Sequence, residues 1–110
     1  MIQICALNDL DDPGAREFLL GDEKSGTQGF VVRHGNKVFA YVNCCPHAGA
    51  MLNWGPGKFL TRDGALIMCS MHGANFLPST GLCVAGPCKG RSLQPLRVEV
   101  VNDYVMVGGV

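Results

Sequence analysis

Two short segments of this sequence each place a cysteine close to a histidine. They are Cys45-Pro46-His47, with the spacing C-x-H, and Cys69-Ser70-Met71-His72, with the spacing C-x-x-H. Thiolate sulfur and imidazole nitrogen are common protein ligands of zinc and iron. The two segments therefore predict one metal centre with four ligands, Cys45, His47, Cys69 and His72.

The residues around the two pairs narrow the kind of metal centre. The first pair is followed by Ala48-Gly49-Ala50-Met51-Leu52 and the second by Gly73-Ala74-Asn75-Phe76. With Thr80-Gly81, Gly86-Pro87, Leu93, Pro95 and a valine-rich C-terminal segment, these motifs resemble Rieske-type ferredoxins and small Rieske domains over residues 29–107. Neither half of the motif is specific alone, whereas the two halves with their flanks are.

The resemblance implies a cofactor and a function. One [2Fe–2S] cluster would be held by Cys45 and Cys69 on one iron and by His47 and His72 on the other. The protein would carry single electrons from a reductase to a terminal oxygenase or reductase, and it would not itself be an enzyme. No flavin motif, nucleotide motif or catalytic triad pattern is present in the sequence.

Two alternatives remain open on the sequence. The chain could be a non-catalytic, ferredoxin-like small subunit of a nitrite-reductase-like or oxygenase complex, with its cluster permanently docked. In a different functional class, two cysteines and two histidines also suit a structural zinc site or a redox-sensing module.

The loop between the two pairs is longer than is usual for Rieske-type ferredoxins. The extra residues fall in 53–59, which contain Trp54, two glycines and a proline. We expect them to lengthen the loop and leave the ligands in place, with Trp54 packed as its anchor.

The resemblance also predicts a low reduction potential. High-potential Rieske proteins carry a disulfide between the two ligand loops, and a serine and a tyrosine that donate hydrogen bonds to sulfur. This sequence has Ala50 and Met71 at the disulfide positions, and Ala74 and Phe76 at the hydroxyl positions. Without donors that stabilise the reduced cluster, its potential should be of the low ferredoxin type.

The sequence has six cysteines, and four of them are not predicted ligands. Cys44 offers a rival pair, Cys44-x-x-His47, but we expect it to be a small buried residue of the preceding strand. Cys83 and Cys88 are expected to be packed thiols rather than a functional disulfide. By resemblance, Gly86-Pro87-Cys88 would form a third loop that shields the cluster. Among the histidines, His34 is expected to sit at a hairpin turn without a functional role.

Composition excludes several classes of protein. The chain has 110 residues, which fits a single domain over residues 1–110. Nine basic and nine acidic residues give no net charge, which argues against a nucleic-acid partner. No apolar stretch is long enough for a membrane helix, and the N-terminal residues lack a signal peptide pattern, so we expect a cytoplasmic protein with no membrane partner.

The sequence predicts that the elements that position the ligands are short strands. Residues 2–6 alternate, with Ile2, Ile4 and Ala6 on one face, whereas 15–20 are ambiguous between helix and strand. Turn residues join further strand pairs at 30–33 with 38–42, 59–61 with 65–68, 75–77 with 82–85, and 96–100 with 104–107. This pattern predicts an all-β fold, an antiparallel β-sandwich or barrel. Each cysteine–histidine pair follows a strand directly, which predicts a small cluster-binding subdomain of loops over about residues 44–90.

Overall fold

The computed structural model describes residues 1–21, 26–46, 49–71 and 73–108, and these form an almost purely β structure. The predicted all-β, antiparallel fold is confirmed. In chain order the elements are β1 (Ile2–Ala6), the 3-10 helix η1 (Leu7–Asp9), β2 (Gly14–Leu20), β3 (Thr27–His34), β4 (Lys37–Val42), β5 (Ile67–Met68), β6 (Asn75–Phe76), β7 (Cys83–Ala85), β8 (Pro95–Leu96), β9 (Val98–Val101) and β10 (Tyr104–Val107). No helix among these residues is long and apolar enough to span a membrane.

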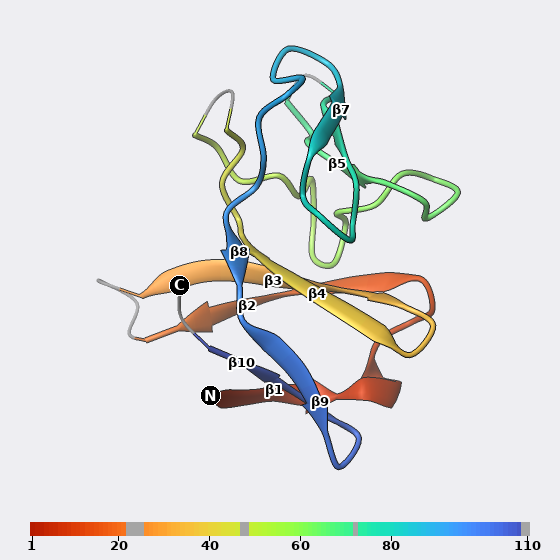
Figure 1. Ribbon diagram of the computed structural model, residues 1–110, viewed down its shortest axis with the longest axis vertical. Coiled ribbons are helices and arrows are strands. Elements are labelled where there is room, and N and C mark those ends of the chain that lie inside the picture. The colour runs from red at the N-terminus through yellow and green to blue at the C-terminus, as the bar shows by residue number, and fades with distance from the viewer. Residues whose placement is uncertain (22–25, 47–48, 72, 109–110) are drawn as a thin grey trace.

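The strands form three antiparallel sheets in the orders β1-β10-β9, β2-β3-β4-β8 and β5-β6-β7. The four-stranded sheet lies in the middle of the molecule, as Figure 1 shows. The β1-β10-β9 sheet lies at one end, and β5 to β7 lie at the other together with the loops that carry the predicted ligands.

The central sheet separates two hydrophobic cores because its side chains alternate between its faces. On one face Val31, Ala40 and Leu96 pack with Val105 and Val107 of the end sheet. On the opposite face Phe30, Val32 and Tyr41 pack in the core that also contains Cys45 and Cys69. The predicted cysteine ligands are therefore anchored in a core of their own, against the rigid middle of the fold.

Three of the four strand pairs predicted from turn residues are present, whereas 59–61 and 65–68 are joined only by the isolated bridge between Leu60 and Ile67. His34 pairs with Lys37 across Gly35-Asn36, and Tyr104 pairs with Val101 across Asn102-Asp103. Asn102 and Asp103 have φ of 51° and 65°, a conformation that two-residue hairpin turns require and that these residue types tolerate. The ambiguous residues 15–20 belong to β2, whose whole length pairs with β3.

The alternation expected in the first strand differs from the structure. Ile2 is exposed, and the buried residue of β1 is Cys5, which is 6% exposed. The register with β10 shifts between Gln3 and Cys5, so an irregularity interrupts the simple alternation of sides. Cys5 is thus a residue of the core that is remote from the ligand loops.

Candidate metal centre

Cys45 and Cys69 begin two loops that follow strands, as the sequence predicts. Cys45 lies shortly after the end of β4, and Cys69 comes directly after β5. Each cysteine is only 1% exposed, and both belong to the same hydrophobic core. The strands thus deliver two thiols to one water-poor region.

The two loops have the same backbone hydrogen-bond pattern. The amide of Cys45 donates to the carbonyl of Ala50 over 2.8 Å, and the amide of Gly49 donates back to the Cys45 carbonyl over 2.8 Å. In the second loop the amide of Cys69 donates to the Ala74 carbonyl over 2.8 Å, and Gly73 donates to the Cys69 carbonyl over 3.0 Å. Each loop is closed on itself, so each cysteine is held by a fixed local backbone.

A glycine makes each closure possible. Gly49 has φ of 68° and Gly73 has φ of 69°, the left-handed conformation that glycine adopts without steric cost. The shared sequence pattern is C-x-x-x-G-A, at residues 45–50 and 69–74. This repeat is a signal in the sequence for two equivalent loops, in addition to the cysteine–histidine spacings.

The two loops are also joined to each other. The amide of Ser70 donates to the Leu52 carbonyl over 2.9 Å. Asn43, a buried polar residue just before the first loop, accepts from the Leu52 amide over 2.8 Å and donates to Asn53 Oδ1 over 3.0 Å. Because Leu52 is bonded on both sides, the loop of Cys45 cannot shift without disturbing the loop of Cys69.

The other two predicted ligands, His47 and His72, lie outside the described residues. The same holds for Ala48, which belongs to the first loop. The assignment of the histidines therefore stays a prediction from their spacing. What the structure describes is the framework on either side of them, residues 45–46 and 49–50 in one loop and 69–71 and 73–74 in the other.

A third segment reaches the ligand loops. Gly86 packs so tightly on the second loop that a Cβ atom there would lie 2.8 Å from the Cα of Ala74. Arg91 Nη1 donates to the Pro46 carbonyl in the first loop over 3.1 Å. The segment after β7, with Pro87 exposed at its surface, thus lies against both loops, which agrees with the predicted shielding role of Gly86-Pro87-Cys88.

The expectation that Cys44 is a buried residue of the preceding strand is wrong. Cys44 is exposed and lies beyond the end of β4, and so it is not a buried residue of that strand. Cys45 is 1% exposed and belongs to the core, whereas the adjacent Cys44 is exposed. Of the two rival pairs, only the one containing Cys45 therefore has its thiol in the core beside Cys69.

Cys83 and Cys88 are both buried, at 1% and 2% exposure, and form no disulfide. The Sγ of Cys88 lies 3.0 Å from the Sγ of Cys83, as in a hydrogen-bonded pair of thiols. Packed thiols are therefore the observed state, and their closeness to each other was not expected from the sequence.

The expectation that Trp54 packs as the anchor of the long loop is wrong. Trp54 is 49% exposed and does not anchor the long loop. The loop is held instead by Leu52 and Phe59, which are both fully buried, and the Phe59 ring stacks on Phe30 with ring centroids 4.4 Å apart. An apolar residue at each end of 53–58 is sufficient to anchor it, which leaves Trp54 at the surface.

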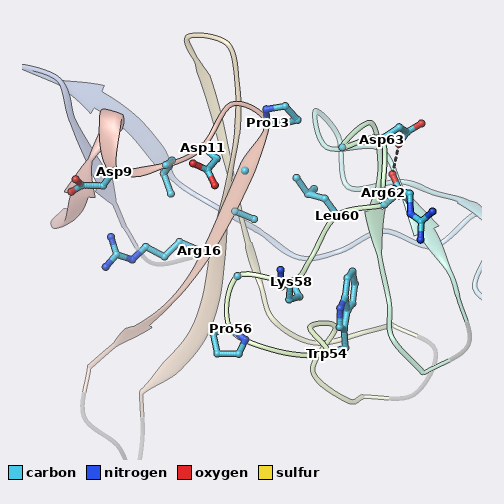
Figure 2. A pocket seen from close by; sticks show the side chains of 16 residues that line it. Asp9, Asp11, Pro13, Arg16, Trp54, Pro56, Lys58, Leu60, Arg62 and Asp63 are labelled. Carbon is cyan, nitrogen blue, oxygen red and sulfur yellow. Dashed lines mark hydrogen bonds between the residues drawn. The ribbon is translucent and has the colours of Figure 1, made fainter.

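A cavity of about 1050 Å³ lies between this loop and the strand β2 (Figure 2). Neither Cys45 nor Cys69 lines it. Its charged lining is balanced, with three acidic and three basic side chains, namely Asp9, Asp11, Asp63, Arg16, Lys58 and Arg62. The charged side chains that line the cavity therefore sum to zero, and the lining includes neither of the two described cysteines of the metal centre.

His34 is at the hairpin end of β3, as expected, and its ring has a structural partner. Its Nε2 lies 2.8 Å from the carbonyl oxygen of Gly64. This contact joins the β3–β4 hairpin to the turn that precedes β5.

The described half of the centre fits an iron–sulfur cluster. Cys45 and Cys69 are both buried, and backbone hydrogen bonds fix the loop that carries each of them. This arrangement suits two thiolate ligands of one iron, because the surrounding core excludes water. Bound there, the cluster would supply one-electron redox chemistry.

The comparisons with known proteins agree with this arrangement. The family model described as Rieske [2Fe-2S] domain matches residues 1–104. The ferredoxin component of the alkene monooxygenase system of Xanthobacter autotrophicus (strain ATCC BAA-1158 / Py2) is 30% identical over 109 residues, which cover 97% of this chain and 80% of that protein.

Solved structures are similar over the same extent. The ferredoxin of carbazole 1,9a-dioxygenase from Nocardioides aromaticivorans IC177 has a TM-score of 0.76 at 26% identity, covering 99% of this chain and 97% of that one. A chain in the complex of reduced oxygenase and oxidized ferredoxin of carbazole 1,9a-dioxygenase has a TM-score of 0.77 at 28% identity, covering 97% of this chain and all of that chain. The similarity thus extends over nearly the full length described.

Proposed function

Because this chain belongs to the Rieske [2Fe–2S] domain family, we propose that it is the ferredoxin of an oxygenase or reductase system. It binds one [2Fe–2S] cluster and carries single electrons. A reductase would load the cluster, and a terminal oxygenase or reductase would accept the electron and perform the substrate chemistry. The ferredoxin components among its relatives favour an oxygenase as acceptor.

The observation that carries this proposal is the pair of equivalent loops around Cys45 and Cys69. Two thiols buried in one core, each in a loop with the same closing bonds, support a four-ligand site of which they would be the rigid half. We assign Cys45 and Cys69 as ligands of one iron, and His47 and His72 as ligands of the other. A rigid site suits electron transfer, because the ligands need little rearrangement when the charge changes.

The proposal extends to the organisation and location of the chain. We take residues 1–110 as one Rieske domain in which about residues 44–90 bind the cluster. We place the protein in the cytoplasm, which is consistent with the absence of disulfides among its six cysteines, because thiols stay reduced in that compartment.

Metal analysis and electron paramagnetic resonance test the function directly. Protein purified without exposure to air should be red-brown and should contain two irons and two acid-labile sulfides per chain. After reduction it should give a rhombic Rieske-type signal. A colourless protein with one zinc per chain would contradict the proposal and support the structural zinc alternative.

The surface of the ligand loops suggests how a partner docks. Met51 is 53% exposed and Met71 is 57% exposed, and Pro87 is exposed on the segment packed against both loops. Charged side chains are sparse there, with Lys89 and Arg91 the nearest in sequence. Exposed apolar residues on a polar surface mark interaction sites, and an electron carrier needs an interface that releases quickly, below about 1,200 Å².

Replacing Met71 with glutamate should slow electron transfer to the partner and leave the cluster spectrum unchanged. The new charge would have to lose water in an apolar interface, which weakens the complex. The rate is measured by stopped-flow oxidation of the reduced protein by its partner, at several ionic strengths. For the unchanged protein we expect only a mild dependence on salt, because apolar contact dominates the interface.

Val101→Glu is the matched control. Val101 is 44% exposed on β9, at the end of the molecule opposite the ligand loops, so the same charge there should leave the rate unchanged. Ala48, for which we expect the same effect as for Met71, can be tested in parallel. A rate that collapses as salt rises, or full activity of both charged loop variants, would place the docking surface elsewhere.

A further inference from the structure

Three buried cysteines meet beside the predicted cluster, and only one of them is a predicted ligand. Cys45, Cys83 and Cys88 are all at most 2% exposed and share one hydrophobic core. The Sγ atoms of Cys83 and Cys88 are 3.0 Å apart, and Cys45 lies close enough to interact with the Cys88 thiol. Cys88 therefore lies between a second thiol and the ligand sulfur.

The backbone after β7 holds Cys88 in this place. The amide of Gly90 donates to the Cys83 carbonyl over 3.1 Å, and the amide of Arg91 donates to the Cys88 carbonyl over 2.9 Å. The amide of Cys83 in turn donates to the Arg91 carbonyl over 2.7 Å. The turn over residues 83–91 is closed by these bonds, so the position of the Cys88 sulfur is determined by the fold.

The Cys88 thiol donates to the sulfur of Cys83, and the nearby sulfur of Cys45 is a second acceptor. Cys83 Sγ donates to the carbonyl oxygen of Ala85 over 3.2 Å, so towards Cys88 it acts as an acceptor. The Cys88 proton can then go to either of two sulfurs. When Cys45 binds iron its sulfur carries negative charge, which makes it the stronger acceptor.

Cys88 has the chemistry for this role, because a thiol carries one proton that it can donate. A neutral thiol is a weak hydrogen-bond donor, weaker than the hydroxyl of serine or tyrosine.

We propose that Cys88 donates an S–H hydrogen bond to the ligand sulfur of Cys45 and thereby raises the reduction potential of the cluster, with Cys83 as the competing acceptor. This inference rests on the proposed function, because it requires Cys45 to be a ligand. A donor to ligand sulfur stabilises the reduced cluster, which carries one more negative charge than the oxidised cluster. Because the Cys88 thiol is a weak donor, it shifts the reduction potential only within the low range of ferredoxins.

The test compares midpoint potentials of four proteins with equal cluster content, measured by protein-film voltammetry and by titration of the paramagnetic signal. Cys88→Ala should shift the midpoint to a more negative value than that of the wild type. Cys88→Ser keeps a donor of similar size and should restore the midpoint to the wild-type value or above it. Cys83→Ala removes a buried thiol of the same size together with the competing acceptor, and should not lower the midpoint.

The outcomes separate a hydrogen bond from a packing effect. If Cys83→Ala and Cys88→Ala lower the potential equally, or if the serine variant is as low as the alanine variant, the donor role is wrong. Cys5→Ala, which removes a buried thiol in the other core, controls for a remote loss of packing and should leave the potential unchanged.

The oxidation state of the pair gives a second measurement that does not depend on redox activity. Alkylation under denaturing conditions without a reductant, followed by mass spectrometry, should label both Cys83 and Cys88. A disulfide between them would remove the proposed donor and overturn the inference. If the wild type gives no Rieske-type signal, the proposed function fails, whereas a normal signal with no shift in Cys88→Ala contradicts only this inference.

Discussion

Alanine in place of Cys45 or Cys69 should leave a folded protein with almost no iron, no acid-labile sulfide and no Rieske-type signal. A cluster iron that loses a thiolate ligand in a buried site has no water to replace it. Replacing His47 or His72 should abolish or alter the cluster in the same assays. Iron, sulfide and zinc per chain, with the visible spectrum of protein prepared without air, measure the effect.

The neighbouring residues provide matched controls for each ligand type. Cys44→Ala changes an exposed thiol directly beside Cys45, and Cys5→Ala changes a buried thiol in the other core, so both should keep the full cluster. His34→Ala breaks a contact with the Gly64 carbonyl and should also keep the cluster. Loss of the cluster in Cys44→Ala, with retention in Cys45→Ala, would show that the pair Cys44-x-x-His47 is the true one.

Turn chemistry explains why much of the fold could be predicted from the sequence. Gly35-Asn36 and Asn102-Asp103 are residue pairs that tolerate the backbone conformation of a two-residue turn, and both turns are present between paired strands. The segment 15–20 has no comparable local signal, because its pattern suits a helix as well as a strand. Its strand conformation comes from pairing with β3, and the residues of the segment alone do not reveal this partner.

The candidate site was predictable where side-chain chemistry and spacing decide the outcome. The two cysteine–histidine pairs predict four ligands, and the structure brings two of them, Cys45 and Cys69, into one core. The direction of a side chain at a strand end is a different matter. Whether Cys44 or Cys45 faces inward depends on where β4 ends and how the next loop closes, which spacing alone does not determine.

Contacts between distant segments were the least predictable. The approach of Cys88 to Cys83 and Cys45 depends on how the turn after β7 packs against the ligand loops. Similarly, the exposure of Trp54 follows from the burial of Leu52 and Phe59 at the two ends of its loop. Hydrophobicity alone favours burial of a tryptophan, but only a few side chains of a long loop can reach the core.

Two buried side chains near the cysteines lack the hydroxyl groups that would raise the potential. Ala74 is 1% exposed, and its carbonyl accepts the amide of Cys69 in the second ligand loop. Phe76 is fully buried in β6, opposite Cys83, in the core that holds Cys45 and Cys69. Both side chains therefore belong to the core that contains the two cysteines.

Ala74→Ser and Phe76→Tyr should each shift the midpoint potential of the cluster to a more positive value. A hydrogen bond to a charged acceptor contributes about 1.5–3 kcal/mol, and a bond made only in the reduced state would shift a one-electron couple by about 65–130 mV at most. Protein-film voltammetry of the wild type and both variants measures the shift. The wild-type midpoint itself should be low, since neither hydroxyl is present and Cys88 offers only a weak thiol donor.

Controls in the other core distinguish a hydrogen bond from a general effect of added polarity. Ala40→Ser and Phe18→Tyr introduce the same groups into the core between the central sheet and the β1-β10-β9 sheet, away from both ligand loops. They should leave the midpoint unchanged, although they can lower stability, because a buried hydroxyl without a partner costs about 1–3 kcal/mol. A wild-type midpoint as positive as that of high-potential Rieske proteins would refute the argument, because the protein would then reach that potential without either of the hydroxyl donors on which the argument depends.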